Sequence, residues 1–289
     1  MPIIEPSIRP PSEAQSLLLQ VTCGCSCNSC SFCGAYTDKA FRVKPMPEII
    51  ADINDYARYY PDVKKLFLMD GDALALSNSK LLPILARVRE KLPQVNRVSS
   101  YANGFQITQR SHDELKDLFD NGLKLVYMGL ESGSQEILDN CNKKATVRQM
   151  VDAVGHARDA GIKTSVMVLL GLGGKEGSRM HIEESAKAIN AMQPAYLSFL
   201  SLMIIPGTLL YRQARQGLFE PLGALDFLKE TYEILKLLDL KRSQFYANHA
   251  SNYVPLSGRL PQGKQEMLAL LESAMEGKVG MKPESFRGL

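Results

Sequence analysis

One run of residues decides how this chain folds: Cys23-Gly24-Cys25-Ser26-Cys27-Asn28-Ser29-Cys30-Ser31-Phe32-Cys33. It holds five of the six cysteines and closely follows the apolar residues 17–19, which are typical of a strand. Small disulfide-stabilised folds distribute their cysteines along a short chain, whereas this chain has 289 residues. Thiols two or three residues apart converge readily on one metal centre. The sequence therefore predicts a metal or iron–sulfur site on the loop that leaves the first strand.

Composition and charge are those of an ordinary globular protein, with 45% apolar and 22% charged residues. The net charge of +3 does not favour nucleic acid or an anionic membrane as a partner. No apolar run reaches the roughly 18–20 residues of a membrane span. The N-terminus lacks the basic start and apolar stretch of a signal peptide. We therefore expect a cytoplasmic protein with reduced thiols and no nucleic-acid or membrane partner.

Apolar segments alternate with segments of helical periodicity from residue 17 onward. Strands are expected at 17–22, 65–69, 97–101, 124–129, 163–170 and 196–205. Helices are expected at about 48–59, 79–92, 111–121, 146–160 and 180–192, and then at 209–216, 224–238 and 262–276. Such alternation predicts a parallel sheet with helices outside it.

The unusual motifs all follow strands at their carboxyl ends. They are the cysteine run, Asp70-Gly71-Asp72, Gly129-Leu130-Glu131-Ser132-Gly133-Ser134 and Gly171-Leu172-Gly173-Gly174. In parallel βα architectures the carboxyl ends of the strands meet at one edge, where the chemistry takes place. The motifs together predict a functional site at this edge.

Two cysteine triplets have spacings that suit metal ligation. They are Cys23, Cys27 and Cys30, spaced C-x3-C-x2-C, and Cys25, Cys30 and Cys33, spaced C-x4-C-x2-C. Zinc would need a fourth ligand, and the remaining Cys141 offers no second CxxC pair. Three ligands without a distant partner favour a four-iron cluster with one iron open, over zinc or unliganded thiols.

The run Cys30-Ser31-Phe32-Cys33-Gly34 after a first strand resembles the motif of the radical S-adenosylmethionine (SAM) superfamily. The resemblance extends over residues 17–205. It is nearest to the branch that contains tRNA methylthiotransferases and oxygen-independent coproporphyrinogen dehydrogenase. It implies an α/β fold, an open (β/α)6 partial TIM barrel over residues 16–206. An extended segment, 1–15, precedes this core and a helical C-terminal extension, 207–289, follows it.

The resemblance also implies the cofactors and their ligands. Three cysteines would hold a [4Fe–4S] cluster, and S-adenosyl-L-methionine would chelate the fourth iron. The aromatic residue before the last cysteine is Phe32, which selects Cys30 and Cys33 as ligands. Cys25 is the expected third ligand, one residue further away than in the family's commonest spacing. Cys27 and Cys23 remain alternatives.

Residues that bind SAM follow from the same resemblance. Asp70-Gly71-Asp72 stands where the family has a turn that binds the SAM amino group. Glu131 and Ser132 would face its ribose or methionine part, Lys143 its carboxylate and Gly171 its adenine. The alternative for the serines after Glu131 is to cap the following helix.

A polar segment at 243–253 is the main feature of the C-terminal region. We expect it to cover the open barrel mouth and His249 to move a proton for the substrate. A solvated loop is the alternative.

The predicted function is an oxygen-sensitive radical SAM enzyme. It would reductively cleave SAM to a 5′-deoxyadenosyl radical and abstract hydrogen from a small organic substrate. A flavodoxin or ferredoxin would donate the electron. The alternatives are a tRNA-modifying or tetrapyrrole-directed radical enzyme and, in another class, a non-catalytic iron–sulfur or zinc protein.

Overall fold

A computed structural model describes residues 8–36 and 38–288 of the chain. The strands of its main sheet are β1 (Leu17–Gln20), β4 (Lys65–Met69), β5 (Arg97–Tyr101), β6 (Leu123–Glu131), β7 (Lys163–Leu170), β8 (Tyr196–Ser201), β9 (Ser243–Tyr246) and β10 (Ser257–Leu260). They follow one another in this order, and the sheet is mostly parallel and open, with β1 and β10 as its edges. This architecture confirms the predicted α/β class.

The longer helices agree with the helical segments expected from the sequence, although several bounds differ. They are α1 (Met46–Tyr59), α2 (Asn78–Lys91), α4 (His112–Asp120), α6 (Val147–Asp159), α7 (Gly174–Met192), α8 (Leu209–Arg215), α9 (Ala224–Leu237) and α10 (Lys264–Met275). None of these described helices has both the length and the apolar character of a membrane span.

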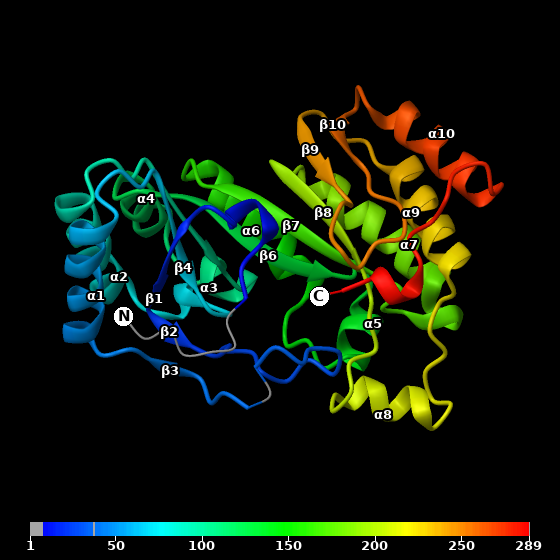
Figure 1. Ribbon diagram of the computed structural model, residues 1–289, viewed down its shortest axis with the longest axis horizontal. Helices are drawn as coiled ribbons and strands as arrows, with labels where there is room; N and C mark the ends of the chain where they lie inside the picture. The colour runs from blue at the N-terminus through cyan, green and yellow to red at the C-terminus, as the bar shows by residue number, and fades with distance from the viewer. Residues whose placement is uncertain (1–7, 37, 289) are drawn as a thin grey trace. The chain divides into compact units, whose positions relative to one another are not determined.

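The chain divides into two compact units, which we describe separately. The first comprises the described residues of 1–28, 35–128 and 155–164. In it β1, β4 and β5 pair in parallel, with Leu19 opposite Leu68 and Leu68 opposite Ser100. Four of the five residues of β4 are buried, as in a strand covered on both faces. Helix α2 packs between α1 and α4 in this unit (Figure 1).

The N-terminal segment is anchored to the first unit through Glu13. This carboxylate is fully buried, and it accepts hydrogen bonds from Tyr127 (2.6 Å) and Arg97 (2.7 Å). We expected residues 1–15 to be extended. Positions 1–7 lie outside the described residues, and within the described part residues 11–13 form a 3-10 helix.

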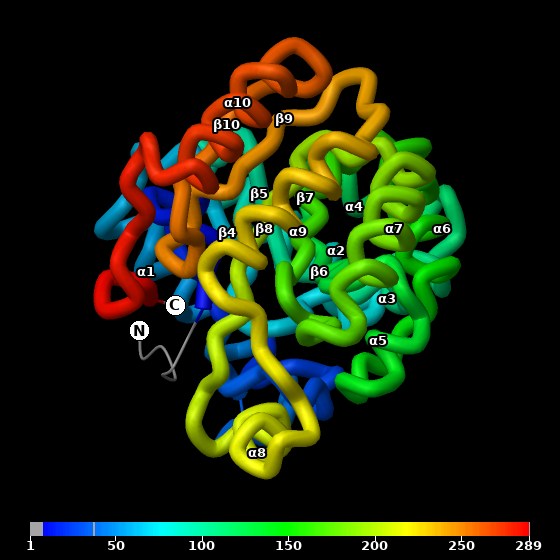
Figure 2. The backbone as a smooth tube through the Cα atoms, turned by 90° about the vertical axis from the view of Figure 1, so that its right-hand side faces the viewer, coloured from blue at the N-terminus to red at the C-terminus, as the bar shows by residue number. Residues whose placement is uncertain are grey.

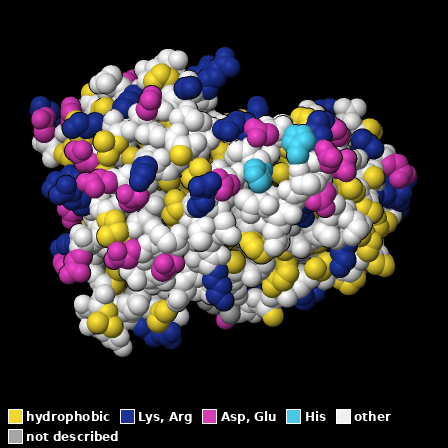
Figure 3. Space-filling model, turned by 180° about the vertical axis from the view of Figure 1, so that it is seen from behind, with side chains coloured by type: hydrophobic (Ala, Val, Ile, Leu, Met, Phe, Trp, Pro, Cys, Tyr) yellow, Lys and Arg dark blue, Asp and Glu magenta, His cyan; other side chains and the backbone are white. Residues whose placement is uncertain are grey.

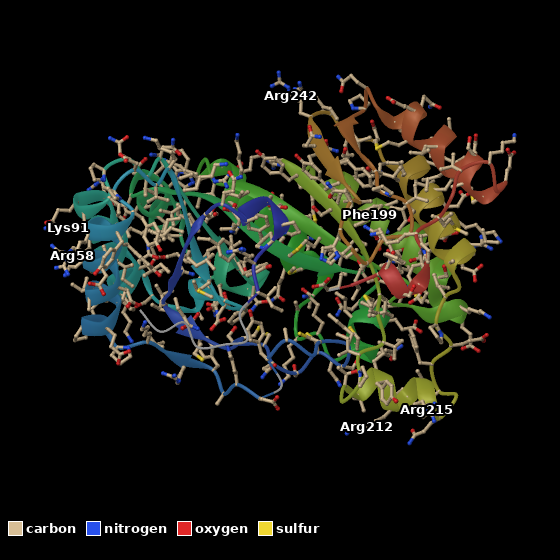
Figure 4. The ribbon with its side chains drawn as sticks, in the orientation of Figure 1. Arg58, Lys91, Phe199, Arg212, Arg215 and Arg242 are labelled. Atoms are coloured by element: carbon tan, nitrogen blue, oxygen red, sulfur yellow. The ribbon has the colours of Figure 1, made fainter. Side chains whose placement is uncertain are left out.

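The second unit comprises the described residues of 29–34, 129–154 and 165–289. In it β7, β8 and β9 pair in parallel, and β9 pairs with β10 as an antiparallel hairpin. Helix α9 packs against α7 and α10 (Figure 2). Phe199 on β8, labelled in Figure 4, is fully buried and meets the ring of Phe245 on β9 edge to face, with centroids 4.9 Å apart.

Several elements differ from the sequence-based expectation. The hairpin β9–β10 extends the sheet from a region that we expected to be helical apart from a polar loop. Its strands are only four residues long, too short for a clear alternation. The short helix α3 (Gly104–Thr108) was not expected, and α5 (Gln135–Asn140) was expected only in the alternative in which a serine after Glu131 caps a helix. Helix α7 begins at Gly174 rather than near 180. The sequence did not predict its first turn, because the glycines in that turn have little helical propensity.

We predict that the hairpin is part of the core of the second unit. Truncation of Phe245 to alanine should lower the free energy of unfolding by about 3–5 kcal/mol, because it opens a cavity against Phe199. Denaturant titration followed by circular dichroism measures this. The matched control is Phe286→Ala, whose side chain is 75% exposed and should cost little. A loss below about 1 kcal/mol for Phe245→Ala would contradict the assignment.

Candidate active site

Acidic residues with left-handed backbone stand at the carboxyl ends of β4 and β6. Asp70 has φ of 69° and Glu131 has φ of 63°. For L-residues this conformation costs roughly 1–2 kcal/mol, and it persists where surrounding contacts fix it. Both turns coincide with motifs that the sequence singled out.

In the first unit, the cysteine loop packs directly on the turn after β4. The amide of Gly71 donates to the carbonyl of Gly24 at 3.0 Å. A Cβ added at Gly71 would lie 2.5 Å from the Cβ and 2.9 Å from the Sγ of Cys25. Asp70 is buried, and its Oδ2 accepts from Gln20 (2.8 Å) and from the Gly24 amide (3.1 Å). Only glycine fits at position 71 while Cys25 keeps this place.

Asp72 connects the same turn to the residue after Cys25. Its buried carboxylate accepts from Ser26 Oγ at 2.5 Å and from Asn103 Nδ2 at 2.9 Å. Burial raises the pKa of Asp72, and the hydrogen bonds from Ser26 and Asn103 offset only part of that rise. Its role toward the SAM amino group remains a prediction, and in the structure its oxygens hold the cysteine loop.

In the second unit, the segment with Cys30 and Cys33 is held on both sides. The amide of Ser31 donates to the carbonyl of Cys141 at 2.8 Å, and the carbonyl of Ser31 accepts from Leu210 at 2.9 Å. Phe32 packs against the apolar cluster of Ile137, Cys141 and Leu172. Phe32 therefore anchors the loop, and Cys141 is a buried thiol packed in this cluster.

Lys143 and Glu131 form an ion pair at the end of β6. Their Nζ and Oε1 atoms are 3.3 Å apart, and the side chains are 10% and 18% exposed. Burial lowers the pKa of Lys143, but Glu131 and Cys30 outweigh burial, so the net shift is upward and the ammonium stays charged. Burial raises the pKa of the Cys30 thiol to about 12, against a lowering effect of Lys143. A charged lysine thus stands close to a predicted cluster ligand.

Gly129 makes room for this ion pair. A Cβ added there would lie 1.9 Å from Oε1 of Glu131 and 3.4 Å from Nζ of Lys143. Any larger residue would displace the carboxylate from its position over the strand.

Ser132 points into the second unit. It is fully buried, and its Oγ lies 2.8 Å from Nδ1 of His181. It also accepts from the amide of Ser134 at 3.1 Å. The hydroxyl of Ser134 in turn caps α5 by accepting from the amide of Ile137, which agrees with the capping alternative.

Gly171 is fixed by helix α9. It has φ of 78°, and a Cβ there would lie 2.6 Å from the ring of Phe227. Its amide donates to Oε1 of Glu230 at 2.5 Å. The turn after β7 therefore depends on the C-terminal region for its conformation.

His249 lies in a turn whose polar side chains bond mainly to β8. The hydroxyl of Ser251 accepts from the amide of Ser201, and Asn252 bonds to Ser201 Oγ and to the carbonyl of Phe199. His249 accepts from the amide of Ser251 at Nδ1, and burial, with Lys282, lowers its pKa. The imidazole is thus neutral at pH 7, and its proton-moving role remains a prediction.

The donor set fits an iron–sulfur cluster in its chemistry. All six cysteines lie in the described part of the chain as thiols outside any disulfide, and the space at Gly71 accommodates Cys25. Within residues 8–36 and 38–288, no three His, Cys, Asp or Glu side chains are gathered closely enough for a single metal ion.

Sequence reasoning missed three polar residues that hold these turns. Asn103 follows β5, so the strand-end rule that selected the other motifs could have found it. His181 and Glu230 are titratable residues on the buried faces of two helices. His181 lies on α7 with the buried Ser185, and Glu230 lies on α9 with the buried Phe227. A polar residue on an apolar stripe was the signal available.

Comparisons with known proteins identify the family. A sequence profile described as "Radical SAM superfamily" matches residues 19–189. An uncharacterized methyltransferase, PH0819 of Pyrococcus horikoshii, is 25% identical over 194 residues, which are 66% of this chain and 40% of that protein. The heme chaperone HemW of Bacillus subtilis is 23% identical over 158 residues, which are 54% of this chain and 41% of that protein. The chain thus spans about two fifths of the length of these relatives.

A solved structure shares the fold. Coproporphyrinogen III oxidase (HemN) of Escherichia coli, described as a radical SAM enzyme, matches with a TM-score of 0.58 at 18% identity. The match covers 76% of this chain and 52% of that one. Proteins of this superfamily are enzymes that bind a [4Fe–4S] cluster and SAM, the cofactors that the resemblance implied. With the profile matching more than half of its residues, the chain belongs to the radical SAM superfamily.

Proposed function

We propose that Cys25, Cys30 and Cys33 hold a [4Fe–4S] cluster in this chain. SAM would bind at the turns after β4, β6 and β7, and a small organic substrate would lose a hydrogen atom. The observation that carries the proposal is the close packing of Cys25 against Gly71. It brings the cysteine motif into contact with the turn at the end of β4.

The residues of the two units suggest distinct roles. The ammonium of Lys143 would attract the SAM carboxylate, and Glu131 would accept hydrogen bonds from its hydroxyl or ammonium groups. Asp70 and Asp72 would hold the turn whose backbone carbonyls approach the amino group. His249 would move a proton for the substrate. When bound, the cluster and SAM supply one-electron cleavage and a 5′-deoxyadenosyl radical.

The charges on the surface do not favour nucleic acid as a partner. Lys and Arg side chains are interspersed with Asp and Glu over the face in Figure 3, and the net charge is +3. A flavodoxin or ferredoxin is the donor that we propose.

A tetrapyrrole-directed function is the second candidate, supported by the name of one relative, the heme chaperone HemW. Titration with hemin and with coproporphyrinogen separates the two: a shifted Soret band or consumption of the porphyrinogen would favour it.

The decisive assay uses anaerobically reconstituted protein with dithionite and SAM. Formation of 5′-deoxyadenosine is expected. Cluster-loaded protein that neither binds SAM nor forms this product would instead be a non-catalytic iron–sulfur protein, and the proposal would fail.

We predict that the ligand triplet can be read from iron content. Cys25→Ser, Cys30→Ser and Cys33→Ser should each lose most of the roughly four irons per chain and the broad absorption near 400 nm, because each removes a thiolate ligand. Cys27→Ser is the matched control and should keep both. Loss of the cluster in Cys27→Ser with retention in Cys25→Ser would transfer the third ligand to Cys27.

We further predict that Lys143 acts on SAM rather than on the cluster. Lys143→Gln should weaken SAM binding about 10- to 100-fold, because a charge-assisted hydrogen bond is lost. Iron content should stay unchanged. Equilibrium dialysis with labelled SAM measures this, and the exposed neighbour Lys144→Gln serves as control. Equal effects of the two variants would refute a specific contact.

A further inference from the structure

Two buried titratable residues connect the turns after β6 and β7. The side chains of His181 on α7 and Glu230 on α9 are both 0% exposed, and Nε2 of the histidine lies 3.6 Å from Oε1 of the glutamate. His181 reaches Ser132 through Nδ1, and Glu230 accepts from the amide of Gly171. The path Ser132–His181–Glu230–Gly171 therefore joins two strand ends through two helices.

Two serines make further polar contacts with the residues of this path. Ser178 donates to Oε2 of Glu230 at 2.5 Å. Ser185 accepts from the amide of Gly133 at 2.9 Å and lies 3.5 Å from Nδ1 of His181. Among the described residues, Nε2 of His181 has no hydrogen-bond partner and faces Glu230. Apolar residues would fill such a position at lower cost, because a buried polar group without a partner is destabilising.

We propose that Glu230 and His181 are positioning residues that couple the two turns, so that SAM affinity depends on whether Glu230 carries a proton. The inference rests on the proposed function, because it assumes that these turns contact SAM. It assigns to the C-terminal helix α9 a role in the cofactor site.

The protonation state of Glu230 decides the direction of the hydrogen bonds. As a carboxylate it accepts from Gly171 and Ser178 and favours the His181 tautomer with hydrogen on Nε2, whose Nδ1 then accepts from the hydroxyl of Ser132. As a neutral acid it can donate to Nε2, and Nδ1–H then donates to Ser132. Charge-assisted hydrogen bonds are about twice as strong as neutral ones, so the carboxylate holds the Gly171 turn more firmly.

The titration falls in an accessible pH range. Burial raises the pKa of Glu230 to about 7, against hydrogen bonds from Ser178 and Gly171, while Asp226 raises it further. Burial lowers the pKa of His181 to about 4, so the imidazole stays neutral between pH 6 and 8. Glu230 therefore loses its charge as the pH falls through 7, and SAM affinity should fall with it.

The charged groups around Glu230 are paired with one another. A cavity of about 440 Å³ beside it is lined by Lys175, Ser178, Ile182, Leu222, Asp226, Lys229 and Glu230. Lys175 pairs with Glu220, and Lys229 lies 4.0 Å from Asp226. This cavity offers protons a route to the buried carboxylate.

The test measures SAM dissociation constants of cluster-loaded protein by equilibrium dialysis at pH 6, 7 and 8. The wild type should bind about fivefold more weakly at pH 6 than at pH 8. Glu230→Gln should bind with the same affinity at both values. His181→Asn keeps an amide near Ser132 and His181→Gln keeps one near Glu230, and each should flatten the profile. The control Glu220→Gln should keep the wild-type profile.

A second measurement, on the wild type without SAM, is independent of variant folding. Hydrogen exchange at the Gly171 amide, corrected for intrinsic rates, should be more protected at pH 8 than at pH 6. Equal protection, or a wild-type profile in Glu230→Gln, would overturn the coupling. Failure of the wild type to bind SAM at any pH would refute the proposed function instead, since the exchange measurement still decides the coupling.

Discussion

The absence of a side chain at Gly71 is the constraint on which the rest of the first unit's site depends. Cys25 occupies the space that a Cβ would fill, and the Gly71 amide bonds to the loop backbone at Gly24. Asp70 and Asp72 on either side are fully buried carboxylates that bond to Gln20, Gly24 and Ser26. Buried carboxylates without such partners would cost several kcal/mol, so the turn and the cysteine loop must form together.

The C-terminal region has a similar relation to the second unit's site. Phe227 and Glu230 lie on one face of α9 and both hold Gly171. The ring of Phe227 packs where a Cβ of Gly171 would lie, and Glu230 accepts a hydrogen bond from the Gly171 amide. The family profile ends at residue 189, before this helix begins. Residues that the family does not specify therefore fix a turn that the family motif contains.

The sequence predicted those features that depend on local pattern. The apolar segments of the sequence located β4, β5 and β7 at their observed bounds, and the run Cys30-Ser31-Phe32-Cys33-Gly34 carried the resemblance to the family. It could not predict the hairpin β9–β10, because four-residue strands gain their stability from contacts such as Phe199 with Phe245 rather than from propensity. Nor could it predict that Ser132 turns inward, since the left-handed backbone at Glu131 reverses the alternation expected of a strand.

The burial of the carboxylates differs within each unit, and it limits which of them can contact a ligand directly. Asp70, Asp72 and Glu230 are buried and accept hydrogen bonds from protein donors, so they are not exposed to a ligand ammonium. Glu131 retains 18% exposure beside the charged Lys143. Under the proposed function, direct recognition of a zwitterion would therefore fall to the Glu131–Lys143 pair of the second unit. The buried carboxylates of each unit instead accept hydrogen bonds that hold the backbone and side chains of its own turns, as Asp70 does for Gly24 and Glu230 for Gly171.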